Sequence, residues 1–518
     1  MSQLTNRKLI AVAGLLPIVL VAAGLFAHPA LAATPGITGT SFSLNAGAAY
    51  ISQPDGQMVY SWGYGCQEAP TGFAPAAISG ASCPSMQLPG PTLIVEEGKA
   101  ISVKLTNNLP AAAGNTSILF PGFDVTTDVG DPGVPGLLTK EAVNGGSVTY
   151  KFSTVGKAGT HTYYSGTRGD LQVEMGLYGA IVVVPKAANV PDACTDPNGH
   201  HAKLPSQTDY RLSSAAYAHP DTCYDREYLF QFSEMDPVIH RQAELQKDKA
   251  CSSPSGCMVV RTENYHPAYF MINGRSMPDD MDPNYAVQYP HQPYNGNPHM
   301  HPGELTLLRI TGQGRWQHPF HEHGNHVRLL ARDGNLILTE ANSKLAGPLL
   351  FTTTTTPGQA MDGIFYWSGK GLNWDVYGHK PGDGSTCVPD ANGYYTSDPT
   401  KLNFYEWCAD HNKALEANPA GDVGSGGPVT LPDPNILAAG PWYGGSAYLG
   451  PDATARASGL TPISPAGTVA NDPGSEAGFA FMWHSHNERE ITTNNAFPGG
   501  MLMMMLVDPY TFVIDESK

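Results

Sequence analysis

The chain has 518 residues and a formal net charge of −17, from 46 acidic and 29 basic side chains. An acidic surface repels the phosphates of nucleic acids, so no nucleic-acid partner is expected. Only 14% of the residues are charged, whereas glycine contributes 57 and proline 44, a balance typical of sheets joined by turns. At roughly 100–200 residues per domain, this length predicts two or three domains.

The N-terminus has the pattern of a secretory signal peptide. Arg7 and Lys8 precede a nearly uncharged apolar run over 9–26, and Ala30-Leu31-Ala32 follows as a small-x-small cleavage signal. We expect residues 1–32 to be removed, which leaves no stable membrane anchor and predicts a periplasmic, extracellular or cell-surface location. The alternative is an uncleaved anchor, because the run is about long enough to span a bilayer.

The cysteines agree with export. Their number is even, and disulfides persist in oxidising compartments. Sequence proximity suggests four pairs, namely Cys66 with Cys83, Cys194 with Cys223, Cys251 with Cys257, and Cys387 with Cys408.

Residues 37–188 are predicted to form a first β domain. Ile101, Val103 and Leu105 alternate with polar residues, as in a strand with one buried face. Residues 148–152 alternate in the same way. The apolar run over 179–185, closed by a proline, suits a last core strand.

A polar segment over 189–218 is predicted to be a linker to a second β domain over 219–515. A long stretch rich in Gly, Pro, Asn and Asp, over 367–474, is too long for an ordinary loop and is predicted to be an insertion. The methionine-rich run over 501–507 could supply thioether ligands, but a buried last strand is the better interpretation. Other strand patterns in this domain cover 226–232, 269–274, 304–310 and 478–483.

Two groups of histidines could bind a metal. One is His318-Pro-Phe-His321-Glu-His323-Gly-Asn-His326, and the other is His484-Ser-His486. Residues two apart on a strand point to the same face, so two such strands side by side can converge four imidazoles. Imidazole nitrogen suits copper, zinc, iron or nickel. We therefore predict that His321, His323, His484 and His486 bind a metal. The alternative is that one of the two pairs lies on the surface and binds no metal.

The same segments resemble a known family. His318-Pro-Phe-His-Glu-His-Gly resembles the third copper-binding motif of multicopper oxidases, and Trp483-His-Ser-His resembles the fourth. The resemblance extends over most of the chain outside the insertion, and it implies two cupredoxin-like Greek-key β-sandwich domains. Further similar segments are Pro89-Gly-Pro-Thr-Leu93, Gly176-Leu-Tyr-Gly-Ala180, Met271-Ile-Asn-Gly274 and Pro302-Gly-Glu-Leu305.

The resemblance also implies roles for the histidines. It makes His321 a ligand of a type 2 copper and His318 a less certain ligand of a type 1 copper. It makes His323, His484 and His486 ligands of paired type 3 coppers.

Several positions depart from the family pattern, which marks a divergent member. Ser485 stands where the family has the cysteine of the type 1 site, and Glu490 stands in place of a later histidine. A blue-copper site needs its thiolate, so none is expected. The first-domain motifs read Leu119-Phe-Pro-Gly122 and Tyr164-Ser-Gly166, without their histidines. We expect a reduced mononuclear or dinuclear copper centre, with zinc as the alternative.

Other residues near these motifs are weaker candidates. His326 and His161 are less certain ligands, since both could be ordinary structural histidines. Tyr164, Glu322 and Glu488 could orient imidazoles or move protons. The alternatives are that Tyr164 is an ordinary core tyrosine and that the two glutamates are solvated carboxylates.

Three functions follow as hypotheses. The first is a copper-dependent oxidoreductase acting on a small-molecule substrate or an oxygen species. The second is a non-catalytic copper-binding or cell-surface interaction protein on the same scaffold. The third is a zinc hydrolase with Glu322 or Glu488 as its base. Assembly into a homo-oligomer is implied only by the resemblance.

Overall fold

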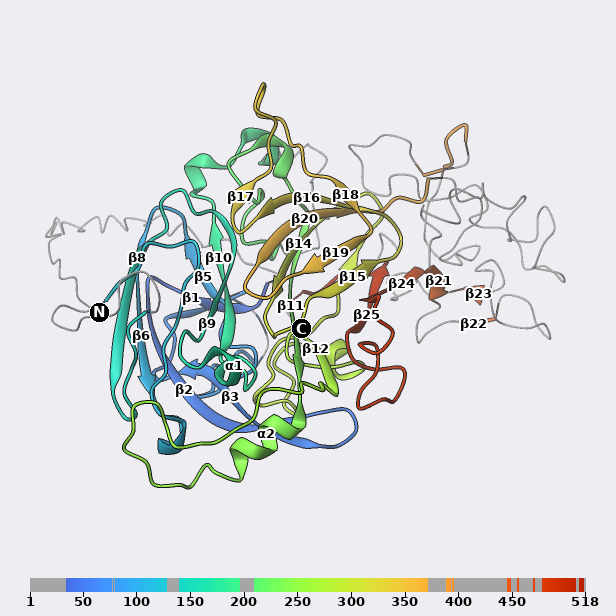
Figure 1. The fold of residues 1–518 in the computed structure, drawn as a ribbon. Helices are drawn as coiled ribbons and strands as arrows, with labels where there is room; N and C mark the ends of the chain where they lie inside the picture. Colours follow the sequence, from blue (N-terminus) through green and yellow to red (C-terminus); the bar gives the residue numbers. More distant parts are fainter. Residues whose placement is uncertain are drawn as a thin grey trace, which may run out of the picture.

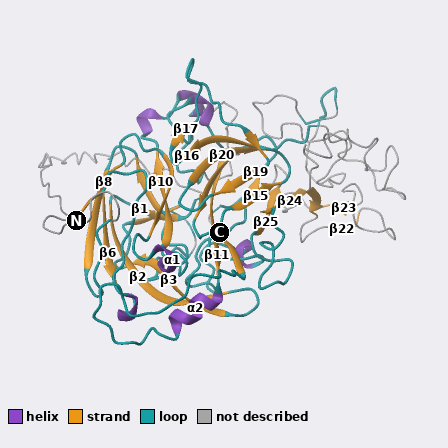
Figure 2. Cartoon of the chain, in the orientation of Figure 1, coloured by secondary structure: helices purple, strands orange, loops and turns teal. Residues whose placement is uncertain are grey.

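A computed structural model describes residues 34–76, 78, 80–127, 139–195, 209–370, 388–392, 394–395, 445–448, 454–455, 469–470, 478–508 and 512–516. The described chain is built almost entirely from β-strands joined by loops (Figure 2). The predicted signal peptide, Cys387, Cys408 and most of the predicted insertion lie outside these residues.

Two five-stranded sheets make up the first half of the chain, drawn in blue and cyan in Figure 1. One has the order β4-β1-β5-β10-β9 and the other the order β3-β2-β6-β8-β7. Their strands are β1 (Gly36–Thr38), β2 (Ser41–Ser52), β3 (Met58–Cys66), β4 (Gly72–Ala74), β5 (Leu93–Glu96), β6 (Ala100–Asn107), β7 (Thr126–Thr127), β8 (Ser147–Ser153), β9 (Gly159–Tyr164) and β10 (Tyr178–Val184).

The core of this half lies between the two sheets. In β6, Ile101, Val103 and Leu105 are buried while the residues between them reach the surface, as their alternation predicts. They belong to one apolar cluster with Leu93 of β5 and Ile181 of β10, which come from the other sheet.

The second half contains two larger sheets. The first has the order β12-β11-β14-β20-β16-β17, with β18 beside β16, and the second has the order β13-β25-β24-β15-β19, with β21 beside β24. Their strands are β11 (Arg226–Met235), β12 (Tyr269–Ile272), β13 (His299–Met300), β14 (Leu305–Gly312), β15 (His318–Glu322), β16 (Val327–Arg332), β17 (Asn335–Leu336), β18 (Leu349–Leu350), β19 (Thr352–Thr355), β20 (Ala360–Tyr366), β21 (Gly445–Tyr448), β24 (Gly478–Ser485) and β25 (Leu502–Val507), while β22 (Thr454–Ala455) pairs only with β23 (Val469–Ala470).

Aromatic side chains fill the space between these two sheets. Phe230 and Phe232 of β11 meet Phe320 of β15 and Trp483 of β24 in one buried cluster. Met503 of β25 lies in the same cluster, fully buried with its neighbours Met501 and Met505, so the methionine-rich run is a core strand. The expected all-β class with two cupredoxin-like β-sandwich domains is confirmed.

The helices are short. Asp236 caps α2 by accepting a hydrogen bond from the Val238 N–H, and a proline follows it in the first turn. Within the described chain, none of the helices is long and apolar enough to cross a membrane. The α-helices are α1 (Gly169–Gln172) and α2 (Pro237–Glu244), and the 3₁₀ turns are η1 (Ala111–Ala113), η2 (Ala187–Asn189), η3 (Asp192–Cys194), η4 (Pro220–Thr222) and η5 (Asp279–Met281).

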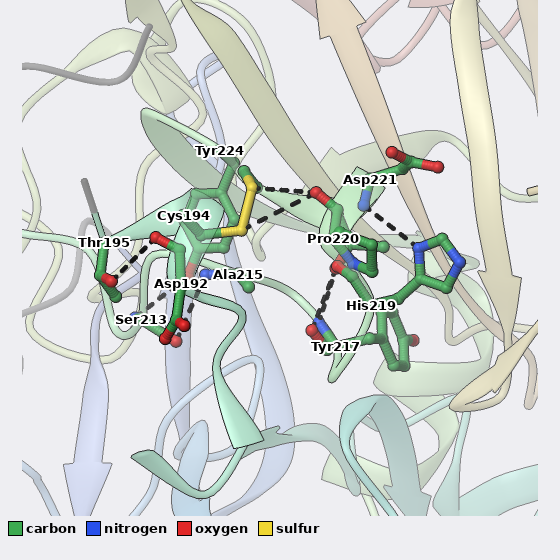
Figure 3. The surroundings of a disulfide bond; sticks show 12 residues. Asp192, Cys194, Thr195, Ser213, Ala215, Tyr217, His219, Pro220, Asp221 and Tyr224 are labelled. Carbon is green, nitrogen blue, oxygen red and sulfur yellow. Dashed lines mark hydrogen bonds between the residues drawn. A yellow bond between two sulfur atoms is a disulfide. The ribbon is translucent and has the colours of Figure 1, made fainter. Parts of the chain in front are cut away.

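Three of the four suggested disulfides are present. Cys66 bonds to Cys83, Cys251 bonds to Cys257, and Cys194 bonds to Cys223, the pair drawn in Figure 3. The last of these joins the end of the first sandwich to the segment that leads into β11. The fourth suggested pair lies outside the described residues.

A buried carboxyl group sits where the two sandwiches meet. Glu174 follows α1, and its Oε1 accepts a hydrogen bond from the Asp236 N–H at 2.7 Å. Its Oε2 is buried without a hydrogen-bond partner in the described chain. Burial raises the pKa of Glu174 to about 8, so the folded protein holds this proton more tightly than the unfolded chain does.

Glu174 should therefore reduce stability as the pH rises. The unfolded carboxyl loses its proton near its ordinary pKa of about 4.3, whereas the folded one keeps it up to about pH 8. The protonated Glu174 carboxyl contributes stability below the unfolded pKa. This contribution is lost as the pH rises from the unfolded pKa to the folded one. We expect Glu174→Gln to flatten the profile of melting temperature between about pH 5 and pH 8 relative to the wild type. The exposed Glu68→Gln should leave that profile unchanged, and an identical profile for both variants would contradict the assignment.

Candidate metal centre

The two His-x-His segments lie on neighbouring strands. β15 pairs antiparallel with β24, with His321 opposite His484 and Glu322 opposite Trp483. Directly opposed residues project to the same face of a sheet, and so do the residues two positions further on. His321, His323, His484 and His486 are therefore presented on one face of this strand pair, with His323 and His486 on either side of the opposed His321 and His484.

The four rings are close to one another. The centroid of the His321 ring lies 4.8 Å from that of His323, 5.6 Å from that of His484 and 4.9 Å from that of His486. The His484 ring lies 5.1 Å from that of His323 and 5.6 Å from that of His486. Four imidazoles from two segments about 160 residues apart thus form one cluster, called the histidine cluster below.

Hydrogen bonds orient two of these rings. His484 Nδ1 lies 2.7 Å from the Ser485 carbonyl oxygen, which can only accept, so Nδ1 carries the proton. In the neutral ring, Nε2 then presents a lone pair, and it faces His323 Nε2 at 3.3 Å. His321 Nδ1 is held at 2.8 Å from Thr352 Oγ1 of β19. A histidine ligand usually binds through one nitrogen while the other is held in this way.

The spacing of the facing nitrogens fits a shared ion. Two nitrogens bound to one tetrahedral ion at about 2.0–2.1 Å lie about 3.3–3.4 Å apart, and the His323–His484 distance is 3.3 Å. However, no three histidine, cysteine, aspartate or glutamate side chains in the described chain can hold an ion as they stand. Turning a side chain about its χ angles redirects its ring while the backbone stays fixed, so the strand register decides which rings can converge. The His486 side chain is 54% exposed and has room to turn.

Two of the rings, His321 and His484, are neutral at neutral pH. Burial lowers the pKa of His321 to about 4, with a further contribution from the neighbouring rings of His323, His484 and His486. Burial also lowers the pKa of His484. Because a metal binds the deprotonated nitrogen, His321 and His484 are in their ligating form without proton loss.

Glu322 lies on the opposite side of β15 from the histidine cluster. It is fully buried, and its Oε1 accepts a hydrogen bond from Thr353 Oγ1 at 2.5 Å. Burial raises the pKa of Glu322 to about 8, so the carboxyl is neutral at neutral pH. A buried, protonated group behind the sheet is poorly placed to act as the base of a hydrolase. Glu488 is 77% exposed, and its Oε1 lies 3.9 Å from His486 Nδ1.

The remaining sequence candidates lie outside the cluster. The His326 and His321 rings both pack against Phe351, with centroids 5.1 and 5.7 Å from it. The His161 ring packs on Phe123 of the first sandwich, and its Nε2 bonds the Lys157 carbonyl at 2.9 Å.

Tyr164 and His318 are also held elsewhere. The Tyr164 side chain packs against a small apolar cluster of buried residues. Its backbone forms an isolated antiparallel β-bridge with Leu119. His318 lies on the core side of β15, where two carboxylates contact its ring. One of them, Glu234 of β11, was not a sequence candidate, because a lone glutamate in an apolar strand 84 residues upstream carries no motif.

Comparison with known proteins finds that part of the first sandwich is similar to multicopper oxidases. The family described as multicopper oxidase matches residues 84–188, within the first sandwich. A multicopper oxidase, MCE, of Talaromyces pinophilus is 38% identical over 105 residues, which are 20% of this chain and 16% of that protein. Laccase 1 of Metarhizium acridum is 35% identical over 100 residues, or 19% of this chain and 15% of that protein. The chain thus spans less than a fifth of the length of these curated relatives.

Two solved structures align with this chain at low sequence identity. The blue copper oxidase of Nitrosomonas europaea aligns over 90% of this chain and 85% of that one, with 15% identity and a TM-score of 0.45. The copper nitrite reductase of the same organism aligns over 64% of this chain and 85% of that one, with 17% identity and a TM-score of 0.39.

Proposed function

We propose that this chain, with its multicopper oxidase domain at residues 84–188, is an exported copper-dependent oxidoreductase with one histidine-ligated centre. The observation that supports the proposal best is the pairing of His321 with His484 on adjacent strands, which gathers four imidazoles on one face of the sheet. The centre is expected to take one copper, or two, held by three or four of these rings.

Bound copper would supply one-electron chemistry at the centre. The chain's own residues would hold and shield it. Ser485 O and Thr352 Oγ1 fix the directions of the His484 and His321 rings. Behind them, the buried Phe320 and Trp483 exclude water from the core side of the sheet. The exposed His486 lies on the open side, where a small substrate or an oxygen species can approach.

Electrons would have to enter this centre directly. Ser485 lies on the core side of β24, in the position of the missing thiolate, and its hydroxyl donates to Glu490 at 2.5 Å. A serine hydroxyl that is already bonded to a carboxylate is no substitute for a copper thiolate. The histidine cluster would then hold the copper that supplies the redox chemistry, without a thiolate-bound copper beside it.

Export is supported by the disulfides. The Cys66–Cys83, Cys194–Cys223 and Cys251–Cys257 bonds are stable in the periplasm or outside the cell but are rare in the cytosol. Together with the signal-peptide pattern over 1–32, they favour a periplasmic or extracellular protein. Homo-oligomerisation stays an expectation from the resemblance alone.

Metal analysis combined with turnover tests the proposal. The protein is purified, its metals are counted, and electron paramagnetic resonance and oxygen uptake with small reductants are measured. We expect copper bound at about one per chain, a paramagnetic Cu(II) signal without the intense blue thiolate absorption, and reductant-dependent oxygen uptake. Copper without turnover would support the binding-protein alternative, and zinc in place of copper would support the hydrolase. The His291→Gln variant should give the same results as the wild type, because His291 is bonded to the Met86 carbonyl away from the cluster.

A further inference from the structure

The core side of β15 holds a closed set of charged groups. His318 Nδ1 lies 2.8 Å from Glu490 Oε2, and His318 Nε2 lies 2.9 Å from Glu234 Oε2. All three residues are at most 2% exposed. One imidazole thus joins a carboxylate of β11 to a carboxylate of the loop after β24. This set is called the Glu-His-Glu bridge below.

The chemistry of the bridge fixes its protonation. An ionised carboxylate can only accept hydrogen bonds, so each ring nitrogen of His318 must donate one. Burial alone would lower the pKa of His318, but the hydrogen bonds to Glu234 and Glu490 outweigh it and raise the pKa to about 9. Both nitrogens therefore carry protons, and neither has a lone pair for a metal.

The bridge is built into the fold at its Glu234 end. Glu234 Oε1 accepts hydrogen bonds from the Arg315 N–H at 2.6 Å and the Trp316 N–H at 2.8 Å. A Cβ on Gly314 would lie 2.1 Å from Glu234 Oε2, so only glycine lets the carboxylate approach the turn before β15. The carboxylate therefore fixes the start of β15 as well as the His318 ring.

At its other end the bridge reaches the residue between two cluster histidines. Glu490 Oε2 accepts from Ser485 Oγ at 2.5 Å as well as from His318. Glu490 Oε1 accepts from Asn487 Nδ2 at 2.9 Å, and the Asn487 N–H donates to Ser485 Oγ at 3.2 Å. Ser485 is thus held on the core side, which requires His484 and His486 to project to the other face.

From these contacts we propose that His318 is a positioning residue, whose imidazolium, clamped between Glu234 and Glu490, sets the direction of the His484 and His486 rings through Ser485. This inference deepens the proposed function. The copper titration described below rests on that function, whereas the magnetic resonance experiment does not. His318 thus carries a proton on each ring nitrogen at the position where the family resemblance implies a ligand of type 1 copper. The bridge joins β11, β15 and the loop after β24 on one side of the sheet while the histidine cluster occupies the other.

Nuclear magnetic resonance of the metal-free protein tests the proposal without any copper. With histidine rings selectively labelled in ¹⁵N and ¹³C, we expect the His318 ring to show two protonated nitrogens at about pH 8, where an ordinary imidazole is neutral. That signal should vanish in His318→Gln. The ring signals of His484 and His486, assigned by their absence in His484→Gln and His486→Gln, should shift in His318→Gln.

Ser485→Ala separates the bridge from its link to the cluster. This variant removes one hydroxyl, so it should fold even if His318→Gln does not, and it should keep the imidazolium signal while shifting the His484 and His486 signals. The control, His291→Gln, should shift neither. A neutral His318 ring at about pH 8, or cluster signals that stay unchanged in both His318→Gln and Ser485→Ala, would overturn the proposal.

A copper titration then relates the bridge to the centre. Groups that orient a ligand typically change metal affinity about 10–100-fold. We expect a loss in this range for His318→Gln and Ser485→Ala, together with an altered Cu(II) resonance spectrum. Wild-type affinity and spectrum in both variants would contradict a positioning role. If the wild-type protein bound no copper, the proposed function would fail while the resonance experiment would still decide the bridge.

Discussion

Replacing His484 with alanine is expected to weaken Cu(II) binding about 100-fold or more, a loss of about 3 kcal/mol. The reason is the geometry of this ring. Its Nδ1 is committed to the Ser485 carbonyl, and its Nε2 faces His323 Nε2 at 3.3 Å. A competition titration against a chelator of known affinity measures the change. His486→Ala should cost less, because that side chain is 54% exposed and least fixed.

The matched control is His291→Ala, which removes an imidazole bonded to the Met86 carbonyl outside the cluster. It should bind copper as the wild type does. If His484→Ala and His291→Ala had the same affinity as the wild type, the copper would be bound elsewhere and the cluster would not be its site.

Replacing Arg309 with methionine is expected to destabilise the fold by about 3–5 kcal/mol, the usual cost of leaving a buried charge without its partner. Arg309 of β14 is fully buried. Its Nε donates to Glu227 Oε2 at 2.9 Å, and its Nη1 lies 3.5 Å from Asp362 Oδ1. Asp362 in turn accepts from the Thr160 N–H at 3.1 Å and hydroxyl at 2.6 Å, which links the second sandwich to β9 of the first.

Chemical denaturation followed by tryptophan fluorescence measures this loss. Arg241→Met is the control, because Arg241 forms an exposed ion pair with Glu244, and such pairs contribute only about 0–1 kcal/mol. Equal stabilities for the two variants would show that the Arg309 network is not what holds the sandwiches together.

Local patterns predicted the strands well. The alternation of Ile101, Val103 and Leu105 is a property of one segment, and burial on one face follows from it directly. The apolar run at β10 was equally clear, since it is buried on both faces. In both cases the information needed lies within a few neighbouring residues.

The histidine cluster was predicted in part. The spacing of two within each pair places its members on one face, but the register of His321 opposite His484 depends on how distant strands pair. Counting by two fails beyond His323, because β15 ends at Glu322 and Gly324 turns the chain with a φ of +97°. His326 therefore packs on Phe351 instead of continuing the row of rings.

The Glu-His-Glu bridge could not be predicted from the sequence. Glu234, His318 and Glu490 come from three remote segments and share no motif. His318 alone looked like a ligand because the family resemblance gives that position a copper. Only the three-dimensional arrangement shows that both of its ring nitrogens face carboxylates.

X-ray absorption spectroscopy of the copper-loaded protein tests the central claim most directly, because it identifies the atoms bound to the metal. Three or four imidazole nitrogens at about 2.0 Å, with no sulfur, are predicted. A sulfur ligand, or a copper with one imidazole or none, would contradict a centre shared by His321, His323, His484 and His486.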